Sequence, residues 1–172
     1  MTKIIQLGDE RLRKVSVPVL ETEINSPEFS KTLENLSEAL RSQSDGVAIS
    51  APQIGVNQRV FAVSTKIFDE EYLEGRVENK FFEHVYFVNP VITKFSKKKE
   101  TAEEGCLSIR GVYGLVERSK NVTIEALNEK GEKFTRGAGG LLARIFQHET
   151  DHLDGILFID RASEIKEIIE EK

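Results

Sequence analysis

Residues 147–155 carry the run QHETDHLDG, in which His148 and His152 stand four positions apart and Glu149 follows the first histidine. An α-helix turns by about 100° per residue, so positions four apart lie on one side of it and both imidazoles can reach a single metal ion. Glu149 then lies beside that ion without having to bind it, where a general base for a water molecule is needed. The spacing therefore predicts a metal-dependent hydrolase whose metal is bound by a helix.

A catalytic zinc-type centre needs a third protein ligand besides the open position for water. Metzincin-like proteases take it from H-E-x-x-H-x-x-G-x-x-H, which this chain follows as far as Gly155 before Phe158 replaces the last histidine. Thermolysin-like proteases take it from a downstream glutamate, but only a short polar tail follows here. The best remaining ligand is Cys106, in the run EEGCLS. As the single cysteine it cannot form an intrachain disulfide, so it must be buried, reactive or a ligand.

Length and composition limit the remaining possibilities. A chain of 172 residues is long enough for one domain with a core and too short for two ordinary ones, so we treat 1–172 as a single catalytic domain. Hydrophobic residues make up 39% and charged residues 31%, which is typical of a soluble globular protein. No apolar run approaches the roughly 20 residues of a membrane span. The N-terminus lacks the features of a signal or transit peptide, so we expect a cytoplasmic protein without membrane contact.

The charge pattern bears on nucleic-acid binding. The net charge of −5 argues against it, because neutralising phosphates requires a basic surface. The one basic run, Lys97 to Lys99, is short and flanked by Ser96 and Glu100, which indicates a solvated turn. We therefore expect no nucleic-acid partner.

Periodicity and capping signals predict a first helix and several short strands. The helix covers about residues 27–43, because Ser26 can cap it, Pro27 suits its first position, and apolar residues recur at helical spacing. These apolar residues are Phe29, Leu33, Leu36 and Leu40. A compact loop follows at 47–55. Strand-like stretches lie at 60–64, 85–88, 112–116 and 122–127, with a hairpin turn at 128–131.

The second long helix should begin near Gly139 and run to about His152, so it carries the histidine pair. Its predicted inward side consists of Leu141, Leu142, Ile145, Phe146 and Glu149. Helix, strands and helix in this order predict an α+β fold in which antiparallel β-sheets pack around a central metal-binding helix. We leave the structure of residues 66–83 open. Residues 162–172 are expected to form a terminal helix with Ile165, Ile168 and Ile169 turned toward the body.

Three motifs together resemble those of the peptide deformylase family, in the family's order. They are a glycine-containing segment that ends in glutamine (GVAISAPQ, 46–53), EGCLS (104–108) and QHE-x-D-H-L (147–153). The second and third are intact, and flanking segments extend the likeness over most of the chain. The resemblance implies removal of the N-formyl group from the N-terminal formylmethionine of new polypeptides, with release of formate.

The resemblance also implies roles in the reaction centre. One divalent ion would be bound by Cys106, His148 and His152. The ion would natively be Fe(II), replaceable by Ni, Co or Zn, and thiolate and imidazole ligands suit all of these metals. Glu149 would take a proton from water activated by the ion and return it to the departing amine. The Gln53 side-chain amide and the Leu107 backbone N–H would face the oxygen of the tetrahedral intermediate.

The implied substrate is the N-formylmethionyl end of a nascent peptide. The pocket for the unbranched methionine side chain would be lined by Val47, Leu141 and Ile145. The main chain that pairs with the extended peptide in a strand-like manner would be that around Ala48, Gly105 and Tyr113. Beside the centre, we predict an ion pair between Glu104 and Arg118 that fixes the cysteine segment, and we expect Asp151 to orient a ligand histidine.

Three residues depart from the family's usual pattern. In its first motif, Ala48 replaces a glycine and Ser50 an alanine, and Arg110 stands where many members have proline. An added Cβ at Ala48 would narrow the groove where the substrate backbone approaches. The C-terminal tail is acidic, so we do not carry over the ribosome docking for which some members use a basic helix.

Two other functions remain open at this point. A zinc endopeptidase would account for H-E-x-x-H. This hypothesis assigns no role to the EGCLS motif, however, and the chain lacks the third metal ligand that such proteases use. A binding protein that keeps the fold and the metal without turnover would fit the altered first motif.

Overall fold

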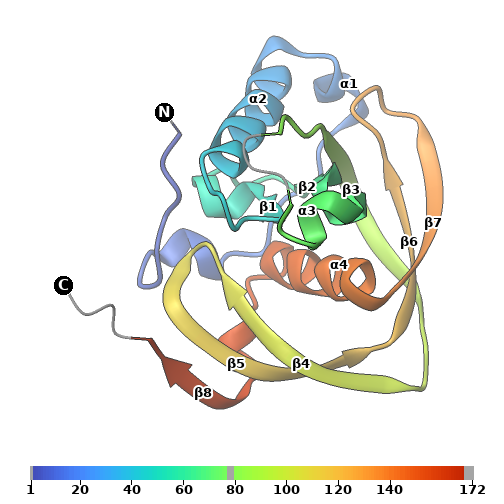
Figure 1. Cartoon of the computed structure of the whole chain (residues 1–172). Helices are drawn as coiled ribbons and strands as arrows, with labels where there is room; N and C mark the ends of the chain where they lie inside the picture. The colour runs from blue at the N-terminus through green and yellow to red at the C-terminus, as the bar shows by residue number, and fades with distance from the viewer. Residues whose placement is uncertain (1, 77–79, 169–172) are drawn as a thin grey trace.

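Helix α4 (Gly140–Leu153) lies in the middle of the molecule, between a long β-hairpin on one side and a sheet with a second long helix on the other (Figure 1). The computed structural model describes residues 2–76 and 80–168. The arrangement confirms the predicted α+β fold, with antiparallel sheets around a central helix. None of the described helices is long and apolar enough to cross a membrane.

The strands form two antiparallel sheets. The larger sheet has the order β1-β2-β3-β6-β7 and the smaller sheet the order β4-β5-β8. The larger sheet consists of Ala48–Ser50 (β1), Val60–Ser64 (β2), His84–Phe95 (β3), Asn121–Leu127 (β6) and Lys133–Gly139 (β7). The smaller sheet consists of Lys99–Cys106 (β4), Ile109–Ser119 (β5) and Ser163–Glu167 (β8). All four predicted strands are therefore present, and the predicted turn joins β6 to β7, where the Asn128 N–H donates to the Glu132 carbonyl at 2.9 Å.

Helix α2 (Pro27–Arg41) begins as predicted and ends two residues before its expected end. The Ser26 hydroxyl accepts a hydrogen bond from the Phe29 N–H at 3.1 Å and so caps the first turn. The predicted apolar residues of this helix are all buried. Each large apolar side chain buried in this way contributes roughly 1.5–3 kcal/mol to folding, which fixes the helix on the larger sheet.

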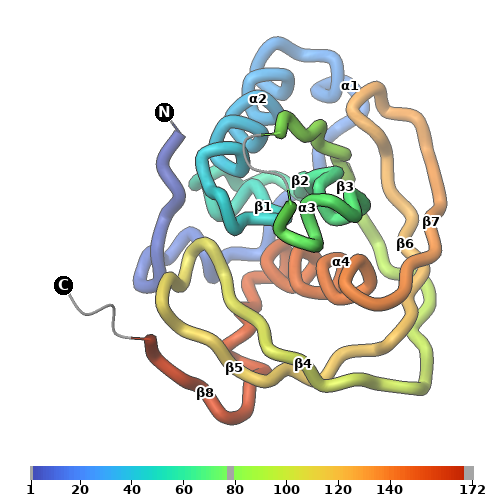
Figure 2. The backbone as a smooth tube through the Cα atoms, in the orientation of Figure 1, coloured from blue at the N-terminus to red at the C-terminus, as the bar shows by residue number. Residues whose placement is uncertain are grey.

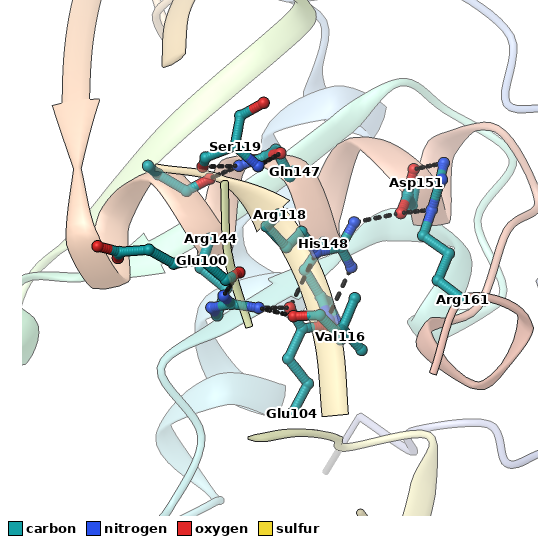
Figure 3. Close-up of polar contacts among 11 residues, drawn as sticks. Glu100, Glu104, Val116, Arg118, Ser119, Arg144, Gln147, His148, Asp151 and Arg161 are labelled. Carbon is teal, nitrogen blue, oxygen red and sulfur yellow. Dashed lines mark hydrogen bonds and ion pairs between the residues drawn. The ribbon is translucent and has the colours of Figure 1, made fainter. Parts of the chain in front are cut away.

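Helix α4 has the predicted boundaries to within one residue and is held on both sides. On one side Phe146 packs against Phe87, with ring centroids 4.9 Å apart. On the other side the Gln147 amide exchanges two hydrogen bonds with the backbone of Ser119, at 2.9 and 3.0 Å (Figure 3). The predicted inward side is wrong at Leu141, which is 49% exposed, because its side chain borders a cavity rather than the core.

Strands β4 and β7 were not predicted, and both are edge strands of their sheets. An edge strand can be polar on both faces, since backbone pairing with a single neighbour holds it. The sequence KETAEEGC of β4 therefore lacks the apolar alternation that marks a strand, yet β4 pairs with β5 from Lys99 opposite Ser119 to Glu104 opposite Gly114. In Figure 2 this hairpin follows the length of α4.

The tail differs from the expected helix. It forms the edge strand β8, in which Tyr113 of β5 lies opposite Lys166. Ile165 and Ile168 are 50% and 60% exposed, so neither is buried in the core, and Ile169 lies outside the described residues. Backbone pairing with β5 has replaced the amphipathic packing that the isoleucine spacing indicated.

The remaining elements are short helical turns. They are η1 (Glu10–Arg13), α1 (Glu21–Ile24), η2 (Ala51–Ile54), η3 (Thr65–Phe68), α3 (Glu70–Leu73) and η4 (Phe158–Asp160). The expected loop at 47–55 contains β1 and η2. The segment 66–83, for which the sequence indicates no particular structure, contains most of η3 and all of α3, and residues 77–79 within it lie outside the described part of the chain.

Candidate metal centre

Cys106 ends strand β4 and meets the two histidines of α4, although 46 positions of sequence separate it from His152. One donor atom from each of Cys106, His148 and His152 lies within 4.8 Å of the others. The Cys106 Sγ and the His152 Nε2 are 3.2 Å apart. The structure thus brings together all three predicted metal ligands.

The donor set fits one ion. Ligand atoms held about 2.0–2.3 Å from a tetrahedral ion lie roughly 3.3–3.8 Å from one another, and the 3.2 Å between the Cys106 Sγ and the His152 Nε2 is close to this range. His148 directs its Nδ1 toward Glu104 at 3.0 Å, which leaves Nε2 for a metal. Burial and the nearby His148 hold the pKa of His152 well below its usual value, so His152 is the neutral form that a metal requires. One thiolate and two imidazoles suit a borderline metal such as Fe(II) or Zn(II).

Glu104 fixes the orientation of His148 (Figure 3). Its carboxylate also receives two hydrogen bonds from Arg118, at 2.8 and 3.0 Å, so the predicted pair with Arg118 is present. Arg144 donates to the same carboxylate at 2.8 Å. Burial by itself raises the pKa of Glu104, but the hydrogen bonds from His148 and Arg118 outweigh it and hold the pKa well below the usual range. Glu104 is therefore ionised throughout the working pH range and accepts the His148 N–H.

Two parts of this network differ from the sequence-based expectation. The Asp151 side chain forms no hydrogen bond with a histidine within residues 2–76 and 80–168. It binds Arg118 at 2.6 Å and Arg161 at 2.7 and 2.9 Å, so it reaches His148 only through Arg118 and Glu104. The role of Arg144 was missed, although its place four residues before His148 puts both on one face of α4.

Glu149 lies on the wall of the same site and is 4% exposed. Its Oε2 has no hydrogen-bond partner among the described residues. Burial, partly offset by the nearby His148, raises the pKa of Glu149 to about 7. A buried carboxyl group that titrates near neutrality can both accept and donate a proton.

The Gln53 amide has a fixed orientation. Its Oε1 accepts hydrogen bonds from the Ser50 N–H at 2.9 Å and the Ser50 hydroxyl at 3.0 Å. Its Nε2 therefore points the other way, 3.2 Å from the Ser108 hydroxyl and 3.5 Å from the Cys106 sulfur. Ser50, which the sequence marks only as a departure from the family pattern, thus positions the amide that was predicted to face the reacting oxygen.

A cavity of about 330 Å³ opens beside these residues. Its lining includes Gln53, Cys106, Leu107, His148 and Glu149 from the predicted reaction centre, and Val47, Ala48, Gly105, Tyr113, Leu141 and Ile145 from the predicted substrate contacts. His152 is not part of the lining. The glycine at 105 is required by packing, since a Cβ there would come within 2.9 Å of the Tyr113 ring. All six predicted substrate contacts therefore border one cavity.

A cysteine and an H-E-x-x-H helix that converge beside a buried carboxyl group define a metallohydrolase type of site in an α+β fold. The polypeptide deformylase family matches residues 1–167, and the chain belongs to this family. Its members are hydrolases that remove the N-formyl group from nascent peptides, and this is the reaction of the chain. The endopeptidase and non-catalytic alternatives are thereby set aside.

Relatives of the same family match over nearly their whole length. The chain is 40% identical to peptide deformylase 2 of Clostridium perfringens, over 98% of this chain and 97% of that protein. A crystal structure of the Thermotoga maritima peptide deformylase is similar with a TM-score of 0.79 at 37% identity, covering 95% and 98% of the two chains. The Met-Ala-Ser-bound structure of the Acinetobacter baumannii enzyme is similar with a TM-score of 0.80 at 34% identity, covering 94% and 99%.

Proposed function

We propose that the chain performs this deformylation at the centre formed by Cys106, His148 and His152, with Glu149 as the residue that transfers the proton. The observation that supports the proposal is the convergence of three donor atoms within 4.8 Å, next to the buried and partly unpaired carboxyl group of Glu149. A divalent ion held there supplies a Lewis acid that polarises the formyl carbonyl and activates water. We propose Fe(II) as the native metal and Ni, Co or Zn as substitutes, because the donor set suits all four.

Glu149 carries the proton through the reaction. It accepts the proton of the attacking water and later donates it to the methionine nitrogen as the C–N bond breaks, so that formate and a free amino terminus result. Its raised pKa supports both directions of transfer, since a carboxyl group that titrates near neutrality is neither too weak a base nor too weak an acid.

Gln53 and Leu107 stabilise the negative charge that develops on the formyl oxygen. The Gln53 Nε2 is directed toward the cysteine because Ser50 holds the other end of the amide. We assign the second donor to the backbone N–H of Leu107, the residue after Cys106. Two donors fixed in advance stabilise the tetrahedral intermediate without having to reorient during the reaction.

The N-formylmethionyl end of the peptide occupies the cavity. The cavity volume lies at the lower end of the range for small-ligand sites, and we assign its apolar wall to the methionine side chain. That wall consists of Val47, Leu141 and Ile145. The main chain around Ala48, Gly105 and Tyr113 pairs with the extended peptide. The related Acinetobacter baumannii enzyme has been crystallised with Met-Ala-Ser bound, and this peptide is the product of the same reaction on a formylated tripeptide.

The setting of the reaction completes the proposal. We treat 1–172 as one catalytic domain and place its activity in the cytoplasm, where nascent peptides are made. The proposal includes no nucleic-acid or membrane partner. It also includes no docking on the ribosome through the tail, because exposed Glu164 and Glu167 of β8 oppose binding to a polyanion.

The test is metal analysis paired with a formate assay on protein purified without oxygen. We expect about one divalent ion per chain, and formate released from formyl-Met-Ala-Ser in equal amount to new amino groups. The matched control is Cys106→Ser, which should lower both the metal content and the formate release. Protein that holds one ion and releases no formate would overturn the proposal, as would a Cys106→Ser variant with undiminished metal and activity.

A further inference from the structure

An ion pair lies across the edge of the substrate cavity. Arg110, near the start of β5, donates from Nη1 to the Asp45 carboxylate at 2.6 Å, and its Nη2 contacts the Gln43 side chain. Both Arg110 and Asp45 line the cavity. Their side chains are 42% and 59% exposed, so the pair lies at the solvent-open part of the cavity lining. It joins the connection that leads to Ala48 with the strand that carries Tyr113, two of the residues proposed above to pair with the substrate backbone.

The chain segment that carries the Asp45 carboxylate is held by hydrogen bonds to its backbone. Residues 42–47 connect α2 to β1, and the Ser44 carbonyl in this connection accepts hydrogen bonds from the Lys66 ammonium and the Tyr72 hydroxyl, both at 3.1 Å. Lys66 is buried. The hydrogen bond from Arg110 lowers the pKa of Asp45, so the carboxylate is charged at neutral pH. Asp45 is therefore held by Arg110 at its side chain and by the hydrogen-bonded Ser44 carbonyl next to it in the backbone.

The charges of the cavity divide into an inner and an outer group. The inner carboxylate Glu104 is already satisfied by Arg118, Arg144 and His148. The outer charges among the described lining residues are Asp45, Arg110 and Glu103. Arg110 is the one cation of this outer group. Without it, two carboxylates would face whatever enters the cavity.

The direction of the substrate follows from the proposed function, on which this inference rests. The formyl group lies at the metal ligands and the methionine side chain lies against the apolar wall. The residues that follow methionine then leave through the open edge, beside the Arg110 and Asp45 side chains. We propose that this ion pair determines which charged residues are accepted directly after formylmethionine: the Arg110 guanidinium binds an acidic side chain, and the Asp45 carboxylate binds a basic one.

The expected size of the effect follows from exposure. Solvent screens a half-exposed charge, so one contact of this kind changes kcat/KM by about twofold to fivefold. The sensitive quantity is therefore the ratio of kcat/KM for formyl-Met-Glu-Ser to that for formyl-Met-Lys-Ser. Any change that affects all peptides alike cancels in this ratio.

The experiment compares this ratio in the metal-loaded wild type, Arg110→Gln, Asp45→Asn and the double variant. We expect Arg110→Gln to lower the ratio about twofold to fivefold and Asp45→Asn to raise it by a similar factor, with the double variant close to wild type. Both shifts should shrink in high salt. Inhibition by the products Met-Glu-Ser and Met-Lys-Ser should change in the same directions, which gives a readout independent of turnover.

The matched control is the exposed ion pair of Lys99 and Glu117, 3.2 Å apart and away from the cavity. The double variant Lys99→Gln, Glu117→Gln should leave the ratio unchanged. If both cavity variants change all peptides by one common factor, or change none, the inference is wrong. If the loaded wild type does not release formate even from formyl-Met-Ala-Ser, the proposed function itself has failed, and the two failures are thus distinguishable.

Discussion

The same pairing of arginine with a carboxylate occurs at the two ends of the site, in opposite surroundings. At the inner end, Arg118 and Glu104 are each 4% exposed and hold His148, a proposed metal ligand, in place. At the outer end, Arg110 and Asp45 are 42% and 59% exposed and line the cavity. A buried charge left without its partner is costly, whereas an exposed one is solvated by water. The inner pair is therefore constrained by folding, and the outer pair can change with the substrate at little cost to stability.

The largest expected effect lies at the inner end, on Glu149. Glu149→Ala removes the proton-transferring group and should lower kcat by about 10²–10⁴-fold. The metal content should stay at one ion per chain, because Glu149 is not a ligand. Single-turnover kinetics and metal analysis on the same preparation measure both. A variant that comes out metal-free, or that keeps nearly full activity, would show that the role is wrongly assigned.

The second effect contrasts the stability of the two pairs directly. Arg118→Met leaves Glu104 and Asp151 with a missing partner in the interior and should lower the free energy of unfolding by about 3–5 kcal/mol. Arg110→Gln, its matched control, should lower it by no more than about 1 kcal/mol. Urea unfolding of the two variants at one pH gives the comparison. Equal losses of unfolding free energy in the two variants would mean that burial does not determine how much each ion pair contributes to stability.

The third effect is a pH dependence of stability in the metal-free protein. Burial raises the pKa of folded Glu149 to about 7, above its unfolded value of about 4.3. Between these values the unfolded chain releases the proton and the folded chain retains it, so stability falls as the pH rises from about 4 to 7 and then levels off. Glu149→Gln should lack this decline. Parallel curves of unfolding free energy against pH for the two proteins would exclude a raised pKa.

Asp45, the carboxylate of the outer pair, should show the opposite dependence of stability on pH. Its partner Arg110 lowers the pKa of Asp45, so the stability contributed by Asp45 is present above the unfolded pKa and is lost as the pH falls below about 4. The effect should be small because the group is largely exposed. Asp45→Asn compared with wild type in acid unfolding measures it, and a loss of stability at rising pH would have the wrong sign.

The smallest effect concerns Ser50. Ser50→Ala removes one of the two hydrogen bonds that hold the Gln53 amide and leaves the backbone N–H of residue 50 in place. We expect kcat to fall by about twofold to fivefold with KM unchanged, corresponding to about 1 kcal/mol for one neutral hydrogen bond. Steady-state kinetics on formyl-Met-Ala-Ser measure this, and a change confined to KM would point to substrate binding instead.

The sequence predicted those features that short-range patterns encode. The repeat of apolar residues marks α2, and the spacing of His148 and His152 marks α4 and two ligands. The pair of Glu104 and Arg118 could be predicted because Glu104 lies just before the cysteine and Arg118 follows on what resembles a neighbouring strand. The motif order, through the family resemblance, also indicated which distant residues would share the cavity.

The features that the sequence did not predict depend on tertiary pairing. Strand β4 is stabilised by its partner β5 and not by an apolar face, so its own residues carry no strand signal. The tail forms β8 for the same reason, against its helical pattern. Asp151 binds Arg118 and Arg161 instead of a histidine, because which of several cations a buried acid meets depends on how α4 lies against β5 and the η4 segment.

Strand β4 has one further consequence. Within three residues it contributes Cys106, a proposed metal ligand, and the carboxylate of Glu104 that orients His148, a second proposed ligand, on α4. Lifting this strand from the helix would remove both at once. The centre should therefore form in a single cooperative step when the hairpin docks, and ion affinity and hairpin docking should be thermodynamically linked.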